Sequence, residues 1–204
     1  AAVLAQLRTS TEVELIATRR EAIRAPQAVE ATLAAMRRGV PVIYQGVLHD
    51  RESQTYGAPD FLVRSDELRR LFPEAIEDFE SVTPAPILGQ PFHYRVVDAK
   101  FTTLSLQKKT GELGNAGSCL AYKAQLFIYG RALGALQGYL PPRAYLLGRS
   151  WQRGDARGSS AFERLAPVSH TREVKKGVYL GAVVHEAVES VRRGRRERAR
   201  WSAL

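Results

Sequence analysis

The stretch Tyr94-Arg95-Val96-Val97-Asp98-Ala99-Lys100 predicts a central strand and the beginning of a chemical site. A β-prone run leads into Asp98, and successive side chains in a strand point to opposite faces. Asp98 and Lys100 are therefore expected on one face of the strand, with Ala99 on the other. A carboxylate and an ammonium at this spacing are also compatible with a simple surface ion pair, so the tripeptide alone is weak support for a site.

A second acidic residue strengthens the interpretation. Asp60 follows Gly57-Ala58-Pro59 and opens another strand-like run that continues to Arg64. Two carboxylates that converge from neighbouring strands make a hard-oxygen site suited to Mg²⁺. Farther along, Gln125 and Tyr129 are four residues apart in a helix-like segment, so both lie on one helical face and can lean toward the strand. Taken singly, Asp60 is typical of a turn or surface acid, and Tyr129 is typical of the edge of an amphipathic core face.

Composition favours one core and a polyanionic partner. With 204 residues and 45% hydrophobic content, the chain is expected to form a single domain over residues 1–204. Its 30 Lys and Arg against 21 Asp and Glu give a formal net charge of +9. That charge points to nucleic acid before membrane, since no apolar run approaches the roughly 20 residues of a membrane span.

The single cysteine limits the chemistry further. Cys119 alone excludes an intrachain disulfide framework and an intrachain four-thiolate cluster, and it suits a reducing, intracellular compartment. The four histidines show no pairwise metal-ligand spacing; they are His49, His93, His170 and His185. The sequence begins at Ala1 without Met, which is compatible with processing or with excision from a larger protein.

The expected elements follow the order helix, three strands, helix, strand. Pro26 and Gly39 bracket an Ala-rich helix, and β-branched and aromatic residues mark the strands. This order predicts an α/β fold with a mixed central β-sheet flanked by helices. The elements are a helix at 27–38, strands at 40–48, 60–64 and around Asp98, a helix at 119–136 and a strand at 143–147.

Other segments are expected around this core. Residues 65–79 are charged and predict a surface helix, and residues 178–201 predict a long basic helical extension. Polar and glycine-rich composition predicts loops at 50–57, 107–117 and 150–160.

The order of these elements and motifs resembles the PD-(D/E)XK nuclease superfamily and, within it, the RecB-type exonuclease branch. The resemblance spans about residues 27–148. It implies a restriction-endonuclease-like core and a nuclease that hydrolyses DNA phosphodiester bonds with Mg²⁺ or Mn²⁺. The branch alone favours exonuclease action, in DNA repair, recombination or replication. The motifs that carry the resemblance are Gly57-Ala58-Pro59-Asp60, Asp98-Ala99-Lys100, Gln125 and Tyr129.

The resemblance also implies roles for single residues. Asp60 and Asp98 would bind the divalent metal, and Lys100 would support the attacking water or the transition state. Gln125 and Tyr129 would orient the site and the substrate. The acidic position on the first helix, a further metal ligand, maps to Glu30. The sequence departs from many members of the branch because no histidine precedes His49, and from many superfamily members because the third-strand acid is Asp rather than Glu.

Two basic segments are candidates for contacts with phosphate. Lys108 and Lys109 begin the 107–117 loop, where a solvated charge pair is the alternative. The C-terminal segment has six arginines against Glu197, a net of five positive charges (six minus one), which would add salt-dependent, sequence-independent affinity for DNA. A solvated helix or a linker to an absent domain explains that segment equally well. The arginines are Arg192, Arg193, Arg195, Arg196, Arg198 and Arg200.

DNA, single-stranded or with free ends, is thus the expected partner, within a larger protein assembly. The alternative from a different class is a non-catalytic nucleic-acid-binding module of a repair assembly. The combination of Asp60, Asp98 and Lys100 argues against that alternative, since a binding module has no need of these three residues together.

Overall fold

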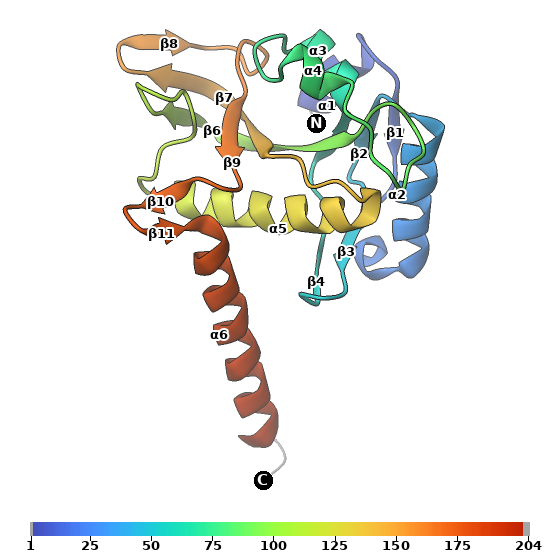
Figure 1. Cartoon of the computed structure of the whole chain (residues 1–204), viewed down its shortest axis with the longest axis vertical. Helices are drawn as coiled ribbons and strands as arrows, with labels where there is room; N and C mark the ends of the chain where they lie inside the picture. Colours follow the sequence, from blue (N-terminus) through green and yellow to red (C-terminus); the bar gives the residue numbers. More distant parts are fainter. Residues whose placement is uncertain (1, 202–204) are drawn as a thin grey trace.

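A mixed β-sheet lies at the centre of the protein (Figure 1). The structure is a computed structural model that describes residues 2–201, but not the side chains of Arg20 and residues 198–201. In the described part, the sheet has seven strands in the order β1-β2-β5-β6-β7-β8, and β9 also pairs with β7. The strands are β1 (Val13–Leu15), β2 (Val42–Tyr44), β5 (Phe61–Arg64), β6 (Tyr94–Leu106), β7 (Arg143–Arg153), β8 (Ala156–Gly158) and β9 (Ala166–Ser169).

The sheet contains both parallel and antiparallel pairs. β1 and β2 run parallel, as do β6 and β7, whereas β5 is antiparallel to both β2 and β6. β8 and β9 both pair antiparallel with β7. The 13-residue strand β6 pairs with β5 over its first four residues, Tyr94–Val97, and with β7 from Val97 to Leu106.

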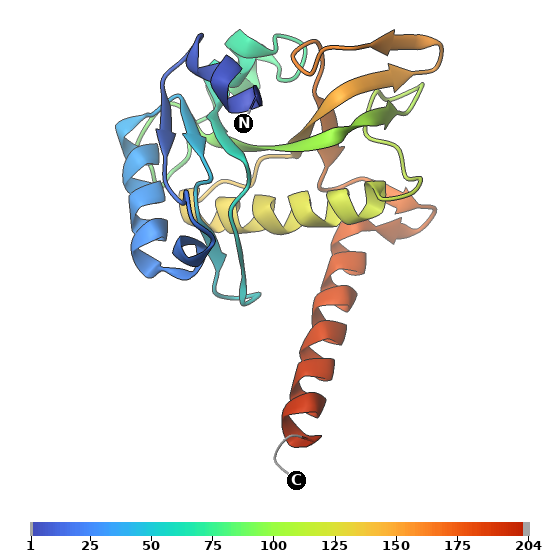
Figure 2. The same cartoon turned by 180° about the vertical axis from the view of Figure 1, so that it is seen from behind.

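Helices cover both faces of the sheet (Figures 1 and 2). On one face, α2 and α5 bury Met36, Leu126 and Leu133 against the strands. On the other face, α1 and α3 bury Leu7 and Leu68 in a second cluster. The predicted α/β class, with a mixed central sheet between helices, is confirmed. The helices are α1 (Ala2–Arg8), the 3-10 helix η1 (Arg20–Arg24), α2 (Pro26–Arg38), α3 (Ser65–Leu71), α4 (Asp78–Ser81) and α5 (Cys119–Gln137).

The strand expected over residues 40–48 is two separate strands. β2 ends at Tyr44, and Gln45 takes a positive φ of 52° before the chain reaches β3 (Leu48–Asp50). Gly46 is needed at the bend, because an added Cβ would lie 2.7 Å from Leu62 Cδ1. β3 then forms a two-stranded hairpin with β4 (Thr55–Gly57), so the predicted loop over 50–57 was also wrong in part.

Two other sequence predictions need correction. The expected loop at 150–160 is a β-hairpin, because β7 continues to Arg153 and β8 pairs back onto it. The surface helix expected over 65–79 is divided into α3, which ends before Pro73, and the short α4. Proline lacks the backbone N–H and disfavours helical geometry in the residue before it, which explains the end of α3.

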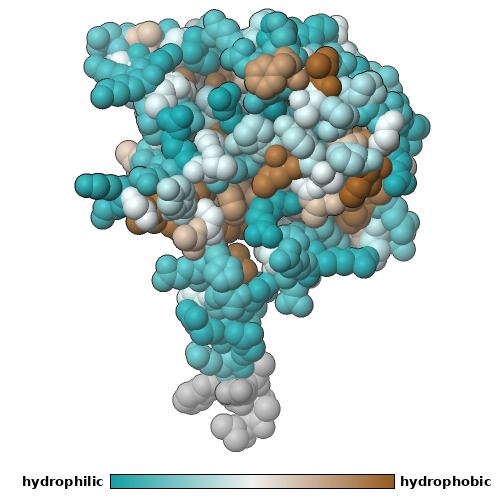
Figure 3. Space-filling model, viewed as in Figure 1, coloured by the Kyte–Doolittle hydropathy of each residue, from teal (hydrophilic) through white to brown (hydrophobic). Residues whose placement is uncertain are grey.

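The helix α6 (Leu180–Trp201) leaves the body of the protein after its first turns (Figures 1 and 2). It follows a small β-ribbon of β10 (Glu173–Lys175) and β11 (Val178–Tyr179). Leu180 and Val184 are buried, and Val188 packs against the same core cluster as α5. On the face seen in Figure 3, the projecting part of α6 carries mostly hydrophilic residues.

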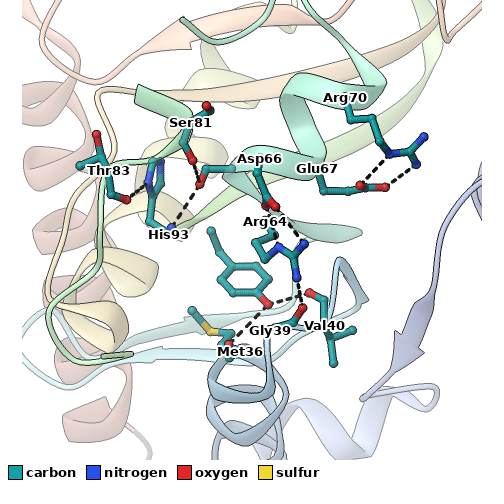
Figure 4. A network of polar contacts seen from close by, with 12 residues as sticks. Met36, Gly39, Val40, Arg64, Asp66, Glu67, Arg70, Ser81, Thr83 and His93 are labelled. Carbon is teal, nitrogen blue, oxygen red and sulfur yellow. Dashed lines mark hydrogen bonds and ion pairs between the residues drawn. The ribbon is translucent and has the colours of Figure 1, made fainter. Parts of the chain in front are cut away.

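The buried ring of His93, the residue before β6, bonds to the segment after α4 (Figure 4). His93 Nδ1 donates a hydrogen bond to the Thr83 carbonyl at 2.8 Å, and Arg95 Nε donates to His93 Nε2 at 2.9 Å. The ring is therefore neutral, with one nitrogen donating and the other accepting. Burial lowers the pKa of His93 to about 4, and the nearby Arg95 guanidinium adds to this effect.

The buried His93 should make the stability of the protein depend on pH. Its folded pKa of about 4 lies below the usual 6.5, so between these values the unfolded chain binds more protons. The stabilising contribution is complete above pH 6.5 and is lost as pH falls toward 4. Urea unfolding at pH 7.5 and pH 5 measures this effect. From the higher pH to the lower, the free energy of unfolding of His93→Gln should fall by about 2 kcal/mol less than that of the wild type. The exposed His185→Gln serves as the control, and an equal loss in all three proteins would contradict the prediction.

Candidate active site

Two carboxylates meet where β5 begins beside β6. Phe61 pairs with Val97, which places Asp60 next to Asp98 across the two strands. Asp60 N donates to Asp98 Oδ1 at 3.3 Å, and Ala99 N donates to Asp60 Oδ2 at 2.9 Å. Each side chain thus accepts a backbone hydrogen bond from the neighbouring strand, which fixes both acids in position.

Lys100 joins this pair from the same face of β6. Its Nζ lies 2.6 Å from Asp98 Oδ2 as an ion pair and donates a hydrogen bond to Gln125 Oε1 at 2.9 Å. The ammonium also lies 5.3 Å from the centre of the Tyr122 ring. Asp98 and Lys100 therefore share one face of the strand, as their spacing predicts, and that face looks toward α5.

The helix α5 supplies the other side of the site. Gln125 Nε2 donates to Tyr129 Oη at 2.9 Å, so the two residues form one hydrogen-bonded unit on a single helical face. The Tyr129 ring packs on Gly57, where an added Cβ would lie 2.3 Å from Tyr129 Cε1. Because Gly57 has no side chain, it leaves the space that the Tyr129 ring occupies.

Charge in this site is concentrated and largely shielded from water. Asp98 is 3% exposed, and its Oδ2 is buried without a hydrogen-bond donor of suitable geometry. The same oxygen still has the Lys100 ammonium beside it, which is an ion pair and not a directed hydrogen bond. Burial raises the pKa of the Asp60 carboxyl, and the neighbouring Asp98 carboxylate raises it further. Burial also raises the pKa of the Tyr129 phenol.

These features fit a hard divalent cation between Asp60 and Asp98. The buried Oδ2 of Asp98 has acceptor capacity left, and a cation would relieve the repulsion that raises the pKa of Asp60. Within the described residues, no three His, Cys, Asp or Glu side chains gather closely enough to hold an ion between them. Two carboxylates suit the coordination preference of Mg²⁺, which keeps several water ligands and is bound through one or two carboxylates and substrate phosphates.

The structure does not bring Glu30 to this site. Glu30 lies exposed on α2, whereas Thr32, two residues later, is fully buried. Thr32 Oγ1 accepts a hydrogen bond from Val47 N at 2.8 Å, which shows that this side of α2 faces the sheet. Two residues correspond to about 200° around a helix. Glu30 therefore projects away from the strands, and the expected third acidic ligand is not part of the carboxylate pair.

A cleft of about 750 Å³ adjoins the site and is lined partly by Asp60 and Lys100. The sequence interpretation did not single out two of its other residues. Phe101 follows Lys100 directly and is 87% exposed, and the Arg149 guanidinium lies 5.1 Å from the centre of its ring. A large apolar residue directly after the Asp-Ala-Lys tripeptide is the sequence signal that could have identified Phe101.

The structure separates the basic candidates into different regions. Lys109 lines a cleft on the opposite side of the sheet from α5, near Phe72 and Tyr145, and Lys108 precedes it in the turn after β6. Arg192, Arg195 and Arg196 line a groove between α6 and β4, and Arg193 is exposed outside it. The side chains of Arg198, Arg200 and Trp201 lie outside the described part.

Comparison with known protein families, with curated proteins and with solved structures found no match for this chain. Among the helices that the structure describes, none is both long and apolar enough to cross a membrane.

Gly57 provides a direct test of the packing that holds Tyr129. In Gly57→Ala, the new Cβ overlaps the tyrosine ring, and such overpacking typically costs ~1–3 kcal/mol. Urea unfolding should show that loss of stability. Gly194→Ala is the matched control, because its Cβ meets no atom within 4 Å and alanine favours the helix. Equal stability of Gly57→Ala and the wild type would mean that Tyr129 does not occupy this position.

Proposed function

We propose that this protein is a metal-dependent deoxyribonuclease with a restriction-endonuclease-like core, related to the RecB-type branch of the PD-(D/E)XK superfamily. One observation carries the proposal: a continuous set of contacts connects two acids, a lysine and a Gln-x-x-x-Tyr pair across β5, β6 and α5. The residues are Asp60, Asp98, Lys100, Gln125 and Tyr129.

The residue types suit hydrolysis of a phosphodiester. Mg²⁺ or Mn²⁺ bound by Asp60 and Asp98 would acidify a water molecule and neutralise charge on the phosphate. Lys100 supplies a fixed positive charge beside the carboxylates, in a partly buried site where charge stabilisation is strong. Gln125 orients the Lys100 ammonium, and Tyr129 orients Gln125, so both act as positioning residues.

The formal charge of +9 supports a nucleic acid as the substrate. We propose DNA, cleaved from free ends within a repair, recombination or replication assembly. A binding module without turnover would keep the basic surface but would not need the carboxylate pair. Degradation of linear but not circular DNA in the presence of Mg²⁺ separates exonuclease action from endonuclease action, and the absence of any degradation favours the binding module.

Asp98→Asn tests the carboxylate pair. The substitution keeps the size of the side chain and removes its negative charge, so Mg²⁺-dependent cleavage should be abolished. DNA affinity measured in EDTA should stay within a few-fold of the wild type. Asp155→Asn, in the exposed turn between β7 and β8, removes the same charge elsewhere and should cleave normally. Near-normal turnover by Asp98→Asn would refute the proposed site.

Lys100→Ala tests the role of the ammonium. Turnover should fall at least ~10²-fold, as when a comparable preorganised group is removed. Binding of Mn²⁺, measured by calorimetry, should persist or tighten, because Lys100 lies 2.6 Å from Asp98 Oδ2 and competes with a cation for that oxygen. Lys176→Ala, which removes an exposed lysine in the turn between β10 and β11, is the control. If metal binding disappears while the fold survives, Lys100 has a different role.

A further inference from the structure

A groove of about 770 Å³ runs between α6 and the β3–β4 hairpin. Its walls combine small apolar residues with long basic ones, spaced three and four residues apart along α6. This spacing places them on one helical face. The groove is lined by Gln54, Thr55, Tyr56, Ala124, Ile128, Val184, Ala187, Val188, Val191, Arg192, Arg195 and Arg196.

The charge of this groove is of one sign. Three arginines line it, and none of its lining residues is acidic. Arg192 is held in place, because it pairs with Glu189 at 2.5 Å and donates to the Ser53 carbonyl. Arg195 and Arg196 are exposed one turn farther along α6. An arginine-lined groove of this kind is complementary to a phosphate backbone.

Tyr56 presents an aromatic ring at the same groove. Tyr56 is 50% exposed. Arg24 Nε donates to Tyr56 Oη at 3.0 Å, and the His49 ring packs on the tyrosine in a T-shaped arrangement, with 5.9 Å between the ring centroids. The ring is thus held from outside the groove and does not need to be ordered when a ligand binds. A fixed, exposed aromatic ring beside arginines is a platform on which an unpaired base can stack.

The groove and the candidate active site share two elements, α5 and β4. Ala124 and Ile128 line the groove, and the residues that follow them on α5, Gln125 and Tyr129, belong to the site. On the other wall, Tyr56 is followed by Gly57, on which the Tyr129 ring packs. A strand bound in the groove would therefore contact the same helix and hairpin that carry part of the site.

We propose that this groove binds an unpaired strand of DNA, with a base stacked on Tyr56 and phosphates contacted by Arg195 and Arg196. A duplex does not suit the groove, because paired bases hide the faces that Tyr56 and the apolar floor would contact. The inference rests on the proposed nuclease function for its choice of DNA as the ligand. The binding itself needs neither metal nor turnover.

Binding of a fluorescent oligothymidylate to the full chain in EDTA tests the aromatic contact. Tyr56→Ala should weaken binding roughly 5- to 150-fold, the range expected for loss of one stacked base. Tyr56→Trp should restore it, which a merely structural role of the tyrosine would not predict. Phe79→Ala removes another aromatic ring, 72% exposed on α4 across the sheet, and should have no effect.

The dependence of affinity on salt tests the arginines. Arg195→Gln combined with Arg196→Gln should reduce the slope of log affinity against log salt by roughly 1.4, or 0.7 for each single-strand phosphate contact. Arg193→Gln, on the same helix outside the groove, should leave the slope unchanged. A reduction of roughly 0.7 in the single control, the same loss per arginine, would mean that α6 acts only as diffuse positive charge. That result would overturn the assignment of a defined strand path.

The outcomes separate this inference from the nuclease proposal. Unchanged binding by Tyr56→Ala, or equal affinity for duplex and single strand, overturns the groove even if Asp98-dependent cleavage is observed. Binding that depends on Tyr56 and Arg195 without any cleavage upholds the groove and refutes the nuclease. If sedimentation shows a dimer that Val191→Glu disrupts, a second copy of the chain covers the groove, and the inference is wrong.

Discussion

The site depends on the buried charge of Asp98, which lies in the layer between the central sheet and α5. An ionised carboxylate in such a place is stable only when it is paired and hydrogen-bonded. The Lys100 ammonium and the backbone N–H of Asp60 meet this need from two neighbouring strands. Lys100 also donates a hydrogen bond to Gln125. The contacts that compensate the Asp98 charge therefore fix the position of the start of β5 and of the helix α5.

The packing of β6 explains why this charge can be placed there. The first part of the strand is apolar on both faces, with Tyr94 and Val96 in the α5 cluster and Val97 in the cluster on the opposite face. This double burial anchors the strand before it reaches Asp98. The apolar core therefore holds the first part of β6 rigidly. This fixes the direction in which the later side chains of the strand point.

Much of this arrangement could be predicted from the sequence, because it follows from local periodicity. The alternation around Asp98 gave the correct face for Lys100, and the spacing of Gln125 and Tyr129 gave their shared helical face. The position of Glu30 could not be predicted in this way. Which side of α2 meets the sheet is decided by tertiary packing, and no local pattern distinguishes a helix acid that faces a site from one that faces solvent.

The groove beside the site could not be predicted from the sequence either, since Tyr56 and Arg195 come together only through tertiary structure. Residues that meet from distant segments carry no shared periodicity. Their geometry nevertheless follows from the constraint at Asp98. The chain that places Asp60 beside Asp98 passes through Gly57, where Tyr129 leaves space only for a glycine. That close contact fixes the end of β4 against α5, and it thereby places Tyr56 on the wall that faces α6.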